Sequence, residues 1–186
     1  MKAILSRRYG SPDVMEWVDL PTPVVGPHQI LVGVRASSVN PVDWKVRRGM
    51  LKPITGLRPP KVLGADFAGE IERVGDEADG CAVGDRVSGL VHALKGGAYA
   101  EKVVVEPREI APMPSNLSFE QAAVLPLVAL TVHRVNLHQR NDVIPPFIVA
   151  LVVSPVQTGM MRYEKGLSLL AHLRYTFLIV IEFRGE

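Results

Sequence analysis

Few side chains in this 186-residue chain could bind a metal or act as a nucleophile, and their spacing argues against both roles. The single cysteine, Cys81, excludes an internal disulfide and a four-cysteine zinc site, and no cationic or histidine-rich segment surrounds it. The five histidines are scattered along the chain, as His28, His92, His133, His138 and His172. His133 and His138 are five residues apart, which does not place them on one face of a helix. We therefore predict no metal site and an inert thiol near a turn.

The glycines are equally informative, because no two of them are spaced as G-x-G anywhere in the chain. A glycine-rich turn at the start of a helix is the usual means of binding the phosphates of a dinucleotide. After residue 137 only Gly159, Gly166 and Gly185 occur, and no strand, glycine turn and helix follow one another there. The sequence therefore lacks a recognisable dinucleotide-binding turn.

Three polar residues are the next candidates for a functional site, namely Asn40, Asp43 and Asp66. Asn40 suits the N-cap of a short helix over residues 41–48, and Asp43 suits the positive end of that helix's dipole. For Asn40, capping alone and a place in a cleft are equally good interpretations. We interpret Asp66 as a turn or salt-bridge residue, and Trp44 as a core residue.

The elements that would position these residues are mostly short strands. Strands are predicted over residues 3–5, 14–18, 30–39, 61–74 and 98–105, with a further strand entered from a turn at 83–87. Ser118 and Gln121 match a capping box, which predicts a helix that ends near Leu125, and residues 127–137 have helical composition. The expected fold is mostly β with short helices.

Composition and charge exclude several classes of protein. The net charge is +2 with 22% charged residues, so no strong electrostatic field points to nucleic acid or to an anionic membrane. No apolar run approaches the roughly 18 residues of a membrane-spanning helix, and the N-terminus lacks the apolar core of a secretory signal. We expect a cytoplasmic protein that binds neither nucleic acid nor membrane, and the sequence does not specify an oligomeric state.

Five ordered segments resemble the medium-chain dehydrogenase/reductase superfamily, specifically its zinc-free quinone oxidoreductase branch. The segments are ASSVNPVDWKVRRG, VLGADFAGEIERVG, VGDRV, GGAYAEKVVV and LSFEQAAVLPLVALTVHR. The resemblance implies a GroES-like, alcohol dehydrogenase-like domain over residues 1–125 and a helix over 126–137 that would lead into a nucleotide-binding domain. Residues 138–186 form an atypical tail, so the Rossmann domain is expected to be missing or truncated.

The resemblance implies chemistry without zinc. In zinc-dependent members of the superfamily the positions that match Asn40 and Ala65 hold a cysteine and a histidine, and neither residue here is a comparable ligand. The implied reaction is hydride transfer from NADH or NADPH to a small-molecule quinone or enone. By the same resemblance, Asn40 is a catalytic and cofactor-binding residue in the cleft beside the nicotinamide, and Thr131 approaches the cofactor.

The missing glycine turn leaves two alternatives for the chain as a whole. In the first, it is a truncated or frame-shifted oxidoreductase with little or no activity. In the second, it is a non-catalytic GroES-like binding module or pseudoenzyme subunit. The apolar runs at 147–153 and 176–183 contain few charged residues that would prevent aggregation. A segment selected for solubility would be expected to carry such residues, so the first alternative is favoured.

Overall fold

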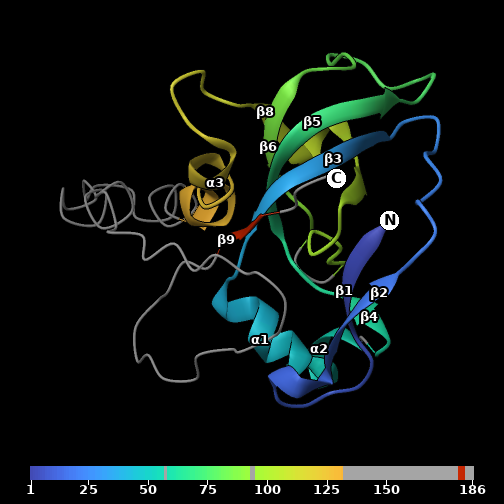
Figure 1. Cartoon of the computed structure of the whole chain (residues 1–186), viewed down its shortest axis with the longest axis vertical. Helices are drawn as coiled ribbons and strands as arrows, with labels where there is room; N and C mark the ends of the chain where they lie inside the picture. Colours follow the sequence, from blue (N-terminus) through green and yellow to red (C-terminus); the bar gives the residue numbers. More distant parts are fainter. Residues whose placement is uncertain (57, 93–94, 132–179, 183–186) are drawn as a thin grey trace.

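The computed structural model describes residues 1–56, 58–92, 95–131 and 180–182 (Figure 1). The strands are β1 (Lys2–Ser6), β2 (Met15–Asp19), β3 (Ile30–Ser38), β4 (Lys61–Val62), β5 (Asp66–Val74), β6 (Arg86–Leu90), β7 (Lys102–Val105), β8 (Ile110–Pro112) and β9 (Val180–Glu182). The helices are α1 (Pro41–Arg47), α2 (Lys52–Thr55) and α3 (Phe119–Ala122), with two 3-10 turns, η1 (Pro12–Val14) and η2 (Pro107–Glu109). Residues 126–131 are also helical. The prediction of a mostly β fold with short helices is confirmed.

The strands form two antiparallel sheets. The larger has the order β7-β3-β5-β6-β8, with β9 paired to β3, and the smaller has the order β2-β1-β4. In Figure 1, α1 and α2 lie beside the smaller sheet, at the opposite end of the molecule from the β5–β6 turn, and α3 lies against the larger sheet. The end of β3 pairs with the start of β5, because Ser37 faces Phe67 in the register. Residues on either side of this junction are therefore held together by the sheet.

Burial of apolar side chains on both faces of β3 and β5 explains why this sheet is the centre of the molecule. Ile30 and Val32 of β3 pack with Phe67 and Ile71 of β5 in the main core cluster. Farther along, Ala36 belongs to a second cluster that includes alanines of and next to α3. With little apolar surface left in water, the sheet is a rigid base for residues at its end.

Gly64 divides one predicted strand into two. The sequence predicts a single strand over 61–74, but Gly64 has φ +89°, where a side chain would be strained and would also meet the Tyr99 ring. The chain therefore turns between β4 and β5, and Asp66 becomes the first residue of β5.

Several predictions concern residues beyond the described ranges. Residues 132–137 of the expected helix, most of the expected tail 138–186, and the histidines at 133, 138 and 172 lie outside the described residues. Within the apolar run 176–183, residues Val180–Glu182 form the strand β9. Over the part of the chain that the structure covers, no helix has the length and apolar character needed to cross a membrane.

Candidate active site

A cluster of buried polar side chains lies where β3 ends and β5 begins. Its members are Ser37, Ser38, Asn40, Asp43 and Asp66. β3 ends at Ser38, Asn40 is the N-cap of α1, and the antiparallel pairing brings both beside Asp66. Buried polar groups need hydrogen-bond partners, so each of these side chains must find one among its protein neighbours.

Asp66 is the centre of the cluster. One carboxylate oxygen, Oδ2, accepts hydrogen bonds from Asn40 Nδ2 at 2.8 Å and from Ser38 Oγ at 3.0 Å. Asn40 Nδ2 also donates to Ser38 Oγ at 3.2 Å. The other oxygen, Oδ1, accepts the backbone N–H of Leu127 at 3.0 Å. A single carboxylate therefore binds residues from two separate parts of the chain, the junction between β3 and α1 and the helix at 126–131.

The prediction that Asp66 is a turn or salt-bridge residue is wrong. Its exposed fraction is 0%, it lies within a strand, and it forms no ion pair with any described residue. Burial raises the pKa of Asp66 from 3.8 to about 6, against the lowering effect of its hydrogen bonds with Asn40, Ser38 and Leu127, and nearby Asp43 raises it further. The carboxyl therefore changes charge in a pH range that an ordinary aspartate does not reach.

Asp43 completes the polar cluster from the first turn of α1. Its Oδ2 accepts the backbone N–H of Asn40 at 2.7 Å and the Tyr99 hydroxyl at 3.1 Å. Burial raises the pKa of Asp43, while the hydrogen bonds from Asn40, Tyr99 and Gly64 lower it. Burial and the Asp43 carboxylate raise the pKa of Tyr99 well above its usual value, so its hydroxyl is a permanent donor. Asp43 thus has the place at the helix start that the sequence predicts, and it also holds Tyr99.

Thr131 lies on the helical segment that begins at residue 126. Its Oγ1 donates to Leu127 O at 2.7 Å, within the same helix, and the residue is exposed. Leu127 is also the residue whose N–H binds Asp66. The two predicted site residues, Asn40 and Thr131, are therefore connected through Asp66 and Leu127, although no direct contact between them is described.

The residues at the two zinc-ligand positions do not fit zinc. Ala65 is fully buried and has no ligand atom, and the Asn40 amide nitrogen is a hydrogen-bond donor, here to Asp66 and Ser38, and not a metal ligand. Within the described ranges, no group of three or more His, Cys, Asp or Glu side chains is arranged to hold a metal ion. Cys81 is a free, half-buried thiol whose pKa is raised by burial and by nearby Asp85 and Asp79, so it stays protonated and unreactive.

Trp44 is not a core residue, contrary to the prediction. Its exposed fraction is 37%, and Lys45 Nζ and Arg48 Cζ lie 5.7 Å and 5.4 Å from its ring centroid. The buried face of α1 instead carries Asp43, Val46 and Arg47, which are three and four residues apart.

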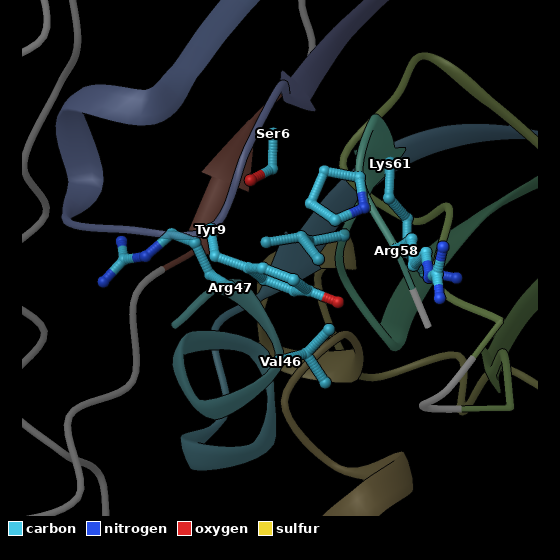
Figure 2. Close-up of a pocket in the computed structure, with 8 residues that line it drawn as sticks. Ser6, Tyr9, Val46, Arg47, Arg58 and Lys61 are labelled. Atoms are coloured by element: carbon cyan, nitrogen blue, oxygen red, sulfur yellow. The ribbon is translucent and has the colours of Figure 1, made fainter. Parts of the chain in front are cut away.

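A small pocket lies elsewhere, and it shares no residue with the polar cluster. It has a volume of about 10 Å³, enough for about one water molecule, and its lining is Ser6, Tyr9, Val46, Arg47, Arg58, Pro59, Lys61 and Leu63. Arg47 is buried, and its Nε has no hydrogen-bond partner among the described residues. In Figure 2 the guanidinium of Arg47 points away from Arg58 and Lys61, so the three cations do not converge on one point.

Sequence reasoning missed Ser38, Tyr99 and the N–H of Leu127 as members of the site. A pair of hydroxyl residues, Ser37 and Ser38, at the end of an otherwise apolar strand was a usable signal, because buried hydroxyls need partners. Tyr99 and Leu127 had no local signal, since each meets the cluster from a distant part of the chain.

Comparison with known proteins matches residues 26–115 to the family described as the alcohol dehydrogenase GroES-like domain. The chain is 32% identical over 135 residues to a chloroplastic quinone-oxidoreductase homolog from Spinacia oleracea, covering 72% of this chain and 41% of that protein. It is 39% identical over 140 residues to a 2-methylene-furan-3-one reductase from Solanum lycopersicum, covering 72% and 36%.

Among solved structures, the Escherichia coli quinone oxidoreductase complexed with NADPH matches with a TM-score of 0.66 at 29% identity, covering 73% of this chain and 40% of that one. The chain therefore spans 36% to 41% of the length of these relatives.

Proposed function

The chain belongs to the medium-chain dehydrogenase/reductase superfamily through its alcohol dehydrogenase GroES-like domain. We propose that it forms the side of the active-site cleft that contacts the hydride acceptor in a zinc-independent NAD(P)H-dependent reductase. We call this the acceptor side. The substrates proposed are small-molecule quinones or enones. The relatives support this class, since they are named as a quinone-oxidoreductase homolog and a furanone reductase, and one solved relative is complexed with NADPH.

The observation that supports the proposal is the hydrogen bonding of the Asn40 side chain. At the position where zinc-dependent members hold a cysteine ligand, this chain has an amide fixed by Asp66 at 2.8 Å and Ser38 at 3.2 Å. A catalytic zinc needs about three nitrogen, sulfur or carboxylate ligands, and Ala65 supplies none. Reduction at this site would therefore depend on orientation of the reactants and not on a Lewis acid.

Asn40 has a limited set of roles in such a site. An amide nitrogen carries two N–H donors, and Asp66 and Ser38 are positioned to accept both. We propose that Asn40 acts as a rigid wall that orients a neighbouring group, while Thr131 lines the cofactor side from the helix at 126–131. Bound NADH or NADPH would supply the hydride, which is chemistry that no side chain provides.

We propose that the described residues contribute one side of a nicotinamide site and not its phosphate end. The sequence has no G-x-G turn, so nothing in it matches the backbone amides that receive the pyrophosphate. We propose that the 186-residue polypeptide alone binds nicotinamide cofactors weakly and reduces quinones slowly or not at all.

Titration of the purified polypeptide with NADPH, followed by tryptophan fluorescence, tests this. No saturation at micromolar cofactor is expected, and micromolar binding with quinone turnover would refute weak binding. A cytoplasmic location and the absence of nucleic-acid and membrane partners are also proposals, and cell fractionation with RNase and carbonate washes tests them.

A further inference from the structure

The two oxygens of Asp66 bind different parts of the molecule. Oδ2 receives Asn40 Nδ2 and Ser38 Oγ, which belong to the junction between β3 and α1. Oδ1 receives the N–H of Leu127, which is 61 residues away in sequence. A carboxylate has about four lone-pair sites, so it can accept all three donors at once.

The contact with Leu127 is made at the start of a helix. Residues 126–131 are helical, so the N–H of Leu127 belongs to the first turn, where backbone donors have no partner within the helix. A negative charge is favourable there because of the helix dipole. One turn later, Thr131 Oγ1 binds Leu127 O at 2.7 Å. The position of Thr131 therefore depends on the position of Leu127.

From this geometry we infer that Asp66 is a positioning residue whose ionised carboxylate fixes the Thr131-bearing helix relative to Asn40. Asp66 would thereby connect the acceptor side of the site to the cofactor side. We call its hydrogen bonds with Asn40, Ser38 and Leu127 the latch. Its meaning for catalysis rests on the proposed function, but the latch itself is a property of the fold.

The latch requires the ionised form. A protonated carboxyl carries an O–H donor. Protonation of Oδ1 would place that donor against Leu127 N–H, and protonation of Oδ2 would require the Ser38 hydroxyl to change from donor to acceptor. Either site of protonation therefore changes the hydrogen bonds around Asp66. The titratable groups acting on Asp66 are Asp43 of α1 and, through its hydroxyl, Tyr99, and no described cation pairs with Asp66. With a pKa of about 6, Asp66 would change these hydrogen bonds in mildly acidic solution.

The test is a pH titration of the full 186-residue chain by NMR, with no cofactor or quinone present. Three signals should change with one midpoint near pH 6, namely the Leu127 amide, the Asn40 side-chain amide and the Thr131 methyl group. Asp66→Asn should abolish the common midpoint in all three, because an amide offers one acceptor edge and one donor edge at every pH. Independent midpoints, or a midpoint that survives in Asp66→Asn, would overturn the inference.

A second pair of variants keeps the carboxyl and so does not depend on the folding of Asp66→Asn. Leu127→Pro removes the donor N–H at the second helical residue, whose N–H has no partner within the helix, and Leu127→Ala retains the donor. The Leu127 hydrogen bond lowers the pKa of Asp66. Its loss in Leu127→Pro should raise the Asp66 carboxyl midpoint by roughly one pH unit, and Leu127→Ala should leave it in place.

Equal midpoints in these two variants would show that Leu127 N–H is not part of the latch. Because none of these signals requires a cofactor, the latch can fail while the proposed reductase function stands, and the reverse also holds.

Discussion

Asp66 makes a quantitative prediction for the stability of the chain. Its pKa is about 6 in the fold and 3.8 in an unperturbed chain, so the folded state binds the proton more tightly than the unfolded state. The resulting stabilisation is fully present below about pH 3.8 and is lost as the pH rises through 6. Between pH 7.5 and pH 5.0, protonation of this buried carboxyl should add about 1.4 kcal/mol to the free energy of unfolding.

Urea unfolding at these two pH values, with the wild-type chain, Asp66→Asn and the control Asp76→Asn, measures this term. The amide introduced by Asp66→Asn carries no charge at either pH, so that variant should lack the gain of about 1.4 kcal/mol. Asp76 is exposed, and its replacement should leave the gain unchanged. Burial also raises the pKa of Asp43. Because Asp43 and Asp66 interact electrostatically, Asp66→Asn removes the Asp66 term and also alters the Asp43 term, whereas the exposed control Asp76→Asn alters neither. A gain in Asp66→Asn equal to that of the wild type would refute the placement of a buried, titrating carboxyl at this position.

Three further substitutions test the surroundings of the site by urea unfolding at pH 7.5. Tyr99→Phe removes the hydroxyl that donates to Asp43 at 3.1 Å, which should cost about 1–3 kcal/mol, and no change would show that Asp43 is satisfied without it. Ser118→Ala removes the cap that accepts Gln121 N at 3.3 Å and should cost about 1 kcal/mol, whereas an unchanged midpoint would mean that α3 is held by packing alone. Gly64→Ala places a side chain at φ +89° against Tyr99 and should cost roughly 1–3 kcal/mol, and a stabilised variant would contradict the described turn.

Much of the secondary structure near the site follows from local chemistry. Asn40, a following proline and Asp43 predict the start of α1, and Ser118 with Gln121 predicts the start of α3, because capping depends on residues only three positions apart. The branched residues of β3 likewise predict a strand. These features are encoded within one or two turns of chain.

The features that sequence reasoning missed depend on distant partners, as for Asp66, or on a helix too short for its buried face to be read, as for Trp44. Asp66 resembles any polar residue near a glycine until β3 and residues 126–131 enclose it, and only then does its burial raise its pKa. Trp44 is large and apolar, which suggested burial, but the α1 face that packs inward carries Asp43, Val46 and Arg47 instead. Periodicity over a seven-residue helix is too short to distinguish these faces.

A chimera tests most directly the proposed role of this domain as the acceptor side of a zinc-independent reductase. Residues 1–131 would replace the matching segment of the Escherichia coli quinone oxidoreductase, which is complexed with NADPH in its solved structure. The chimera should reduce a quinone with NADPH at a rate that EDTA does not change. Asn40→Ala should lower kcat/KM by roughly tenfold, since small losses of orientation are costly. A folded chimera that binds NADPH without reducing quinone, or whose activity EDTA abolishes, would contradict the claim.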